Sequence, residues 1–306
     1  MEEHGRLFLN EHRARGSSPR TIEGYLRDLN RFRTWLTTEG RPTAIGEVRR
    51  EDIVLFLDAL LNLQPSERRR NPAGTAHMVF RSLRAFFNWA AEQEIIPTSP
   101  MRHVKGPRVP EVPIPILDED EIRRLLDTCR RGKTPEDRRD YALLRTFLDT
   151  GARLGEIVGL RIDDYQVEDG LLTIRHETSK SRRTRTVSLS TETQVALGRW
   201  ITLARPRYAD SARERAFWVS PKGALTDSGV AKILQRRARA AGINRVHPHM
   251  FRHTFAHHAL ANGHTEGDVM RRGGWRSRSM LDRYGRTGAS DRSNDAFRAS
   301  GFGDRW

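Results

Sequence analysis

Residues 247–258 read HPHMFRHTFAHH and carry six ionisable groups in twelve positions. Apolar residues recur here at helical spacing: Phe251, Phe255, Ala259 and Leu260. The spacing predicts a helix with one face in a core. On that helix His249 and Arg252 are three residues apart, so the imidazole and the guanidinium point the same way. The pair is suited to binding a phosphate group.

Two other interpretations of this stretch stay open on its residues alone. His249, His253 and His257 recur every four residues, as on a metal-binding face, but no acidic residue or cysteine accompanies them to complete a ligand set. The histidines could also be solvated or locally hydrogen-bonded side chains of an ordinary packed helix. Taken in isolation, the stretch is explained most simply by this packed helix.

Further basic and aromatic residues lie on both sides of this stretch. Ahead of it, the sequence TGARLGE centres on Arg153, and the sequence TSKSRRTR contains Lys180. Behind it, the sequence GGW ends at Trp275, and Tyr284 follows nine residues later. The chain therefore presents, in this order, Arg153, Lys180, His249, Arg252, Trp275 and Tyr284.

These six residues, in this order and at this spacing, resemble the catalytic residues of the tyrosine recombinase (phage integrase) family. The resemblance covers nearly the whole chain. It implies that Tyr284 attacks a DNA phosphodiester and leaves a 3′-phosphotyrosine and a free 5′-hydroxyl. It also implies that Arg153 and Arg252 hold the non-bridging oxygens of that phosphate.

The resemblance assigns roles to the remaining residues as well. It implies that Lys180 protonates the departing 5′-oxygen and that His249 assists proton transfer. It implies that Trp275, which stands where many relatives have a second histidine, donates its indole N–H to the phosphate. Glu156 resembles the carboxylate with which the family supports its first arginine, so we do not expect it to react.

Elementary chemistry supports such a site without a metal or a nucleotide. A phosphodiester gains negative charge on its equatorial oxygens when it is attacked, and each preorganised donor there contributes about 3 to 4 kcal/mol. A phenolate is a better leaving group than an alkoxide, so a tyrosyl ester retains the energy for religation. The chain also lacks a Walker-type phosphate loop, a GxSxG turn and an HExxH motif. We therefore expect no metal and no cofactor.

Two helical parts, joined by a proline-rich stretch, are predicted along the chain. Ser18-Pro19 and Asn71-Pro72 each predict the start of a helix in the first part. Residues 171–190 instead predict two short strands joined by a basic turn. The expected fold class is mainly α, with a small antiparallel sheet in a mostly helical catalytic domain. With the resemblance, the expected parts are a helical, SAM-like core-binding domain at 1–106, a basic linker at 107–116, the catalytic domain at 117–289 and a tail at 290–306.

A net charge of +15 is the main signal of the composition, because such an excess attracts polyanions. The chain has 49 arginines and five lysines. Arginine holds phosphate bidentately, which favours nucleic acid as the partner, although a GC-rich genome produces the same bias. No apolar run is long enough for a membrane span, the start does not resemble a signal peptide, and Cys129 has no second cysteine to pair with. We expect a cytoplasmic, nucleoid-associated protein.

The resemblance also implies partners. It implies a site-specific recombinase on double-stranded DNA, with four protomers on two DNA sites, and it allows for accessory DNA-binding proteins. By length the chain is similar to the simple two-domain Xer-type recombinases. Two alternatives share these residues or this fold: a type IB topoisomerase, which relaxes DNA, and a catalytically silent DNA-binding regulator.

Three large apolar residues stand in the otherwise polar tail: Phe297, Phe302 and Trp306. Exposed aromatics in so short a segment would lower solubility. In the family that the chain resembles, the segment after the tyrosine commonly docks on a neighbour. We therefore expect the tail to pack on a neighbouring protomer.

Overall fold

The structure is a computed structural model and describes residues 1–63, 71–110, 115–175, 184–208, 213–278, 281, 294, 297–301 and 304. The chain forms two compact units, Met1–Val112 and Pro113–Trp306. The division between them falls within the predicted linker, 107–116. Each unit has its own hydrophobic core.

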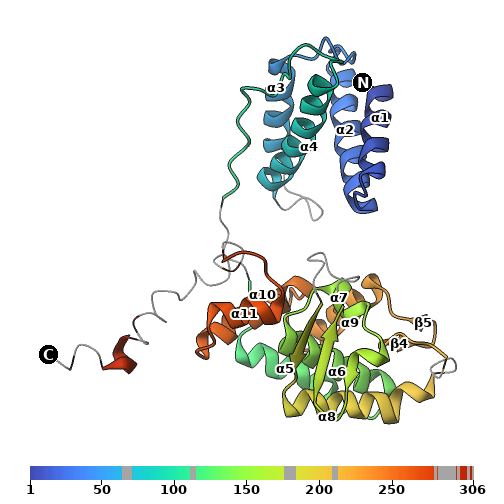
Figure 1. Cartoon of the computed structure of the whole chain (residues 1–306), viewed down its shortest axis with the longest axis vertical. Helices are drawn as coiled ribbons and strands as arrows, with labels where there is room; N and C mark the ends of the chain where they lie inside the picture. Colours follow the sequence, from blue (N-terminus) through green and yellow to red (C-terminus); the bar gives the residue numbers. More distant parts are fainter. Residues whose placement is uncertain are drawn as a thin grey trace. The chain divides into compact units, whose positions relative to one another are not determined.

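Helices make up the first unit (Figure 1): α1 (Glu2–Ala14), α2 (Pro19–Thr38), α3 (Arg50–Leu61) and α4 (Pro72–Glu92). The two predicted helix starts are confirmed. The Ser18 side chain accepts a hydrogen bond from the backbone N–H of Thr21, and Asn71 accepts one from Gly74 at 2.7 Å. Such side chains satisfy backbone donors that have no partner inside the helix. The helix α1 was not predicted from the sequence.

Aromatic side chains fill the core of this unit. The rings of Phe8, Phe32, Phe56 and Phe86 are almost completely buried, and the Phe8 and Phe86 rings meet edge to face. One buried polar contact crosses the core, where Ser82 donates to the Asp28 carboxylate at 2.8 Å. This bond satisfies both groups and links α2 to α4.

The second unit is also mostly helical. Its α-helices are α5 (Glu119–Arg130), α6 (Pro135–Thr150), α7 (Leu154–Val158), α8 (Thr191–Arg199), α9 (Asp227–Ala240), α10 (Pro248–Ala261) and α11 (Glu266–Gly273). Short turns of 3-10 or π-helix are η1 (Ile162–Asp164), η3 (Trp200–Ala204) and η4 (Arg205–Arg207). The helix predicted from residues 247–258 is α10. Helix α6 packs against α5, α8 and α10, so it is the central helix of this unit (Figure 1).

Two antiparallel sheets complete the unit, with strands β1 (Tyr165–Gln166), β2 (Leu171–Ile174), β3 (Arg185–Ser188), β4 (Val219–Ser220) and β5 (Gly223–Ala224). The predicted strand pair is β2 and β3, which align Leu171 with Ser188 and Ile174 with Arg185. The predicted turn between them falls largely outside the described residues. Strands β1, β4 and β5 were not predicted, because two residues are too few to show alternation. The predicted mainly α class with small antiparallel structure is confirmed.

Helix α10 also holds the beginning of this unit. Thr254 accepts a hydrogen bond from the backbone N–H of Leu117 at 2.9 Å, and His258 Nε2 lies 2.9 Å from the Leu117 carbonyl oxygen. The chain just before α5 is therefore fixed on α10. No helix in the described part of the chain is long and apolar enough to cross a membrane.

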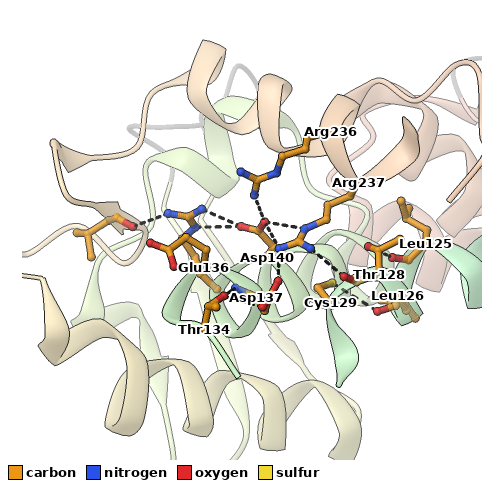
Figure 2. Close-up of polar contacts among 12 residues, drawn as sticks. Leu125, Leu126, Thr128, Cys129, Thr134, Glu136, Asp137, Asp140, Arg236 and Arg237 are labelled. Carbon is orange, nitrogen blue, oxygen red and sulfur yellow. Dashed lines mark hydrogen bonds and ion pairs between the residues drawn. The ribbon is translucent and has the colours of Figure 1, made fainter. Parts of the chain in front are cut away.

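A buried carboxylate joins three helices of the second unit (Figure 2). Asp140 on α6 is completely buried and accepts hydrogen bonds from Arg139 at 2.9 Å, from Arg237 at 2.8 Å and from Arg236. Arg237 on α9 also donates to the Thr128 carbonyl of α5 at 2.8 Å and to Asp137 at 2.7 Å. Asp140 thus compensates the charges that fix α9 against α5 and α6.

We predict that Asp140→Ala lowers the free energy of unfolding by about 3 to 5 kcal/mol, because it removes the buried carboxylate that Arg139 and Arg237 both contact. Urea unfolding measures the effect. The control is Asp120→Ala, which breaks an ion pair with Arg123 whose side chains are 81% and 66% exposed, and which costs less than about 1 kcal/mol. Equal losses in the two variants would contradict this account of the cluster.

Candidate active site

Arg153 stands at the start of α7, immediately after a tight turn. Helix α6 ends at Thr150 and is capped by Gly151, which has a left-handed backbone (φ 56°) that suits glycine. The Arg153 backbone N–H donates to the Glu156 carboxylate at 3.0 Å, and its guanidinium donates to the same carboxylate at 2.9 Å. Glu156 is completely buried, whereas the Arg153 side chain is 19% exposed. The carboxylate therefore sets the direction of a guanidinium that reaches solvent.

The Gly151 turn is packed closely against α10. A Cβ atom added at Gly151 would lie 2.3 Å from the Phe255 ring, which is closer than carbon atoms can approach. Arg252, one turn earlier on α10, is 3% exposed and donates from Nη1 to the Gly151 carbonyl at 2.6 Å. The absence of a side chain at Gly151 thus allows α10 to bring Arg252 next to the start of α7.

The end of α11 binds three arginine side chains. The Arg272 carbonyl accepts a hydrogen bond from Arg185 Nε at 2.8 Å, and the Gly273 carbonyl accepts one from Arg252. The Gly274 carbonyl accepts one from Arg153 at 3.4 Å. Carbonyl groups at a helix C-terminus have no partner within the helix and carry partial negative charge. This helix end is therefore a natural acceptor for guanidinium groups.

Trp275 supports Arg252 from one side. The carbon at the centre of the Arg252 guanidinium lies 3.7 Å from the centroid of the indole ring, a cation–π contact. The indole also stacks on Phe255, whose ring is nearly parallel to it at 6.4 Å between centroids. Trp275 is 6% exposed. The ring therefore restrains the guanidinium plane as well as filling the core.

His249 lies in the first turn of α10 and is exposed. Its ring stacks on that of His253 at 6.4 Å between centroids. Burial is the main cause that lowers the pKa of His253 to about 4, and the nearby positive charges of His249, His247 and Arg252 lower it further. His253 is therefore neutral at pH 7. Within the described ranges, no three histidine, cysteine, aspartate or glutamate side chains gather as metal ligands.

A groove of about 1420 Å³ opens on the second unit beside Arg185 and Trp275. Strand β3 and helices α10 and α11 contribute most of its lining, which includes Arg185, Phe255, Ala259, Met270 and Trp275. The groove thus combines guanidinium groups with apolar side chains.

The sequence comparison identifies the family. Residues 115–290 match the Phage integrase family, and residues 7–94 match the Phage integrase N-terminal SAM-like domain. The chain belongs to the phage integrase family. The resemblance predicted from Arg153, His249, Arg252 and Trp275, together with Lys180 and Tyr284, is thereby confirmed at the level of the family.

Relatives of this phage integrase family member include Xer recombinases. It is 28% identical over 246 residues to tyrosine recombinase XerC of Alcanivorax borkumensis, covering 79% of this chain and 75% of the relative. It is 29% identical over 252 residues to tyrosine recombinase XerD of Listeria innocua, covering 81% and 82%.

Solved structures share the fold. XerH site-specific recombinase bound to palindromic difH substrate, in a post-cleavage complex, matches 92% of this chain and 81% of that chain with a TM-score of 0.74 and 19% identity. A lambda integrase (75–356) dimer bound to a COC′ core site matches 93% and 94% with a TM-score of 0.72 and 15% identity.

Two of the six predicted residues fall outside the described part of the integrase chain: Lys180 and Tyr284. Two described residues lie close to them in the sequence. Arg185, which begins β3, follows Lys180, and Leu281 precedes Tyr284. Leu281 is 2% exposed and packs in one cluster with Phe255 and Trp275. The structure brings Arg153, Glu156, Arg252 and Trp275 together; His249 lies on the same helix as Arg252.

Sequence reasoning missed Arg185 and Arg272. Arg185 is the last residue of the basic segment TSKSRRTR, which is typical of a solvated turn, yet its side chain is only 10% exposed. Arg272 donates to the carbonyl of Asp149 at 3.0 Å and to that of Ser188. Their partners include backbone carbonyl groups, which every residue carries, so no side-chain pattern could have identified them.

We predict that Gly273→Ala lowers the free energy of unfolding by about 1 to 3 kcal/mol. The added Cβ would lie 1.8 Å from the Trp275 ring, so the indole must move. The control is Gly198→Ala on α8, where no atom lies within 4 Å of the added Cβ, and where alanine raises stability by about 0.5 to 1 kcal/mol. A Gly273→Ala protein as stable as the wild type in denaturant unfolding would refute the tight packing.

We predict that His253 contributes to the loss of stability in acid. Because its pKa is about 4 in the folded protein and 6.5 is its ordinary value, the unfolded chain binds the proton first as the pH falls. Stability therefore declines between about pH 6.5 and 4. His253→Gln should reduce the decline from pH 7 to pH 4.5 by about 1 to 2 kcal/mol, allowing for the partial exposure of the ring.

Urea unfolding at the two pH values measures this change. The control is His264→Gln, which makes the same substitution at an exposed histidine of the same unit and reports the effect of the substitution itself. An equal acid-induced decline in His253→Gln and the wild type would show that His253 titrates normally in the folded protein.

Proposed function

We propose that this chain is a site-specific DNA recombinase that cleaves and rejoins duplex DNA through a 3′-phosphotyrosine intermediate. The observation that carries the proposal is the convergence of Arg153 from the start of α7 and Arg252 from α10 on the end of α11, where Trp275 contacts Arg252. Family membership supplies the reaction class. The names of the Xer relatives, which are tyrosine recombinases, support the same class.

In the proposed reaction, the two arginines act on the scissile phosphate. Arg153 and Arg252 hold its non-bridging oxygens and stabilise the negative charge that develops there, each by about 3 to 4 kcal/mol. Glu156 and the carbonyl groups of the α11 end fix the two guanidinium groups before DNA binds. The groups therefore need little reorganisation during the reaction.

The remaining residues carry out the covalent step. The Tyr284 hydroxyl oxygen attacks phosphorus, and the bond from phosphorus to the 5′-oxygen breaks. Lys180 gives a proton to that oxygen, while His249 assists the transfer of the tyrosine proton. Trp275 donates its indole N–H to the phosphate. Attack of a 5′-hydroxyl on the phosphotyrosine reverses these steps and rejoins the strand, so the cycle requires no metal and no ATP.

We propose duplex DNA as the partner and a tetramer on two DNA sites as the assembly. The net charge of +15 favours binding to DNA. Structural neighbours support both proposals: XerH is bound to a difH substrate, and a lambda integrase tetramer is bound to a Holliday junction with a TM-score of 0.69. In this assembly, residues 1–106 form the core-binding domain, 107–116 the linker and 117–289 the catalytic domain, and the protein works on DNA in the cytoplasm, with or without accessory DNA-binding proteins.

We propose that the tail, residues 290–306, packs on a neighbouring protomer. Phe297 in this tail is 58% exposed, and an exposed ring of this size is stabilised by burial. The groove on the catalytic domain offers apolar side chains at Phe255, Ala259 and Met270. These side chains provide a surface that suits the aromatic residues of a second copy.

A nicked suicide substrate tests the proposed function. We predict that wild-type protein forms a covalent DNA adduct, and that Tyr284→Phe binds the same DNA but forms none, because only the nucleophilic oxygen is removed. The matched control is Tyr165→Phe, which removes the hydroxyl of a buried tyrosine in the same unit and keeps the adduct. Denaturing gels detect the adduct, and gel shifts measure binding.

Several outcomes would count against the proposal. An adduct with Tyr284→Phe would place the nucleophile elsewhere. DNA binding by the wild type without any adduct would favour a silent regulator, and relaxation of supercoiled DNA without recombinant products would favour a topoisomerase.

A further inference from the structure

Arg185 lies beside Glu156 in the proposed active site, and its side chain is largely buried. It is the first residue of β3, and its side chain is 10% exposed. Its Nη2 atom donates to the Glu156 carboxylate at 2.7 Å, and its Nε atom donates to the Arg272 carbonyl at 2.8 Å. Arg185 therefore connects the end of α11 to the carboxylate that orients Arg153.

Glu156 is shared by two arginines. Its Oε1 atom accepts from Arg153 Nη1 at 2.9 Å, and its Oε2 atom accepts from Arg185 Nη2. The carboxylate is completely buried, so it depends on both cations to offset its loss of hydration. A pair of Arg153 and Glu156 alone would have no net charge. With Arg185 the group of three carries one positive charge, which attracts a phosphate.

The planar guanidinium of Arg185 is suited to this place. Two of its N–H groups point to different acceptors, one on α7 and one at the end of α11. The third nitrogen, Nη1, lies against Gly274, where an added Cβ would be 2.9 Å away. A lysine has a single nitrogen on a flexible chain and cannot reproduce these two fixed directions.

We infer that Arg185 is a positioning residue for DNA cleavage: anchored by the α11 end, it holds Glu156, and Glu156 holds Arg153 toward the scissile phosphate. The inference rests on the proposed function. It assigns no contact between Arg185 and the phosphate, because its Nη1 atom is buried and its other two nitrogens each donate a hydrogen bond to a protein group. Arg185 acts through Arg153.

A double-mutant cycle tests this order of action. Single-turnover cleavage of a nicked suicide substrate is measured for Arg153→Ala, Arg185→Gln and the combination of both. We expect a loss of at least about 100-fold for Arg153→Ala and of about 10- to 100-fold for Arg185→Gln. If Arg185 acts through Arg153, the double variant cleaves within about threefold of Arg153→Ala alone. A double variant slower by the product of the two losses would overturn the inference.

Arg139→Gln is the matched control. Arg139 is likewise buried and paired with a buried carboxylate, that of Asp140, but it lies in the other ion cluster of the unit. Its effect on cleavage should multiply with that of Arg153→Ala. Equal behaviour of Arg139→Gln and Arg185→Gln in the cycle would reduce Arg185 to a general structural residue and overturn the inference.

A second variant distinguishes a loss of cleavage from a loss of folding. Arg185→Lys keeps the charge, so it should melt close to the wild type and bind DNA with unchanged affinity, yet cleave about tenfold more slowly. Wild-type cleavage by Arg185→Lys would overturn the inference, because charge alone would then suffice. A wild-type protein that forms no adduct overturns the proposed function, and the inference with it. If the wild type cleaves normally and the losses of Arg153→Ala and Arg185→Gln multiply in the double variant, only the role of Arg185 is overturned.

Discussion

Three consecutive carbonyl groups, those of Arg272, Gly273 and Gly274, each accept a hydrogen bond from a different arginine. The arginines come from β3, α10 and the start of α7, elements that are far apart in the sequence. Because a helix end leaves its last carbonyl groups without partners, it can bind guanidinium groups without neutralising them. The end of α11 thus gathers three guanidinium groups from separate elements of the second unit.

Two glycines, which have no side chain, make this arrangement possible. At Gly151 a methyl group would collide with Phe255, and at Gly273 it would collide with Trp275. The two glycines let α10 and the Trp275 ring approach the backbone closely, and the ring then restrains Arg252 by a cation–π contact. The Asp140 cluster stabilises a different part of the unit. There a buried carboxylate compensates the charges of arginines between helices, which stabilises the unit about α6 but is not part of the proposed site.

The features that could be predicted from the sequence are those that leave a pattern in the side chains. Helical spacing and the order of basic and aromatic residues predicted α10, the β2–β3 pair and the family, and Ser18-Pro19 and Asn71-Pro72 predicted two helix starts. The structure brings Arg153, Glu156, Arg252 and Trp275 together. The chemical roles of these four residues, and those of Lys180, His249 and Tyr284, stay predictions. Arg185 could not be assigned from the sequence, since its partners are a distant backbone carbonyl and a carboxylate already explained by Arg153. Two-residue strands such as β4 left no pattern to detect.

The central claim is that the arginines held at the end of α11 act on the charge of the scissile phosphate. The most direct test replaces one non-bridging oxygen of that phosphate by a methyl group, which removes its negative charge, and compares cleavage by wild type and Arg153→Ala. On the ordinary phosphate the variant should be slower by at least about 100-fold, and on the neutral one by less than about tenfold. An equally large defect on both substrates would contradict the claim, because Arg153 would then serve the structure of the site rather than the charge of the phosphate.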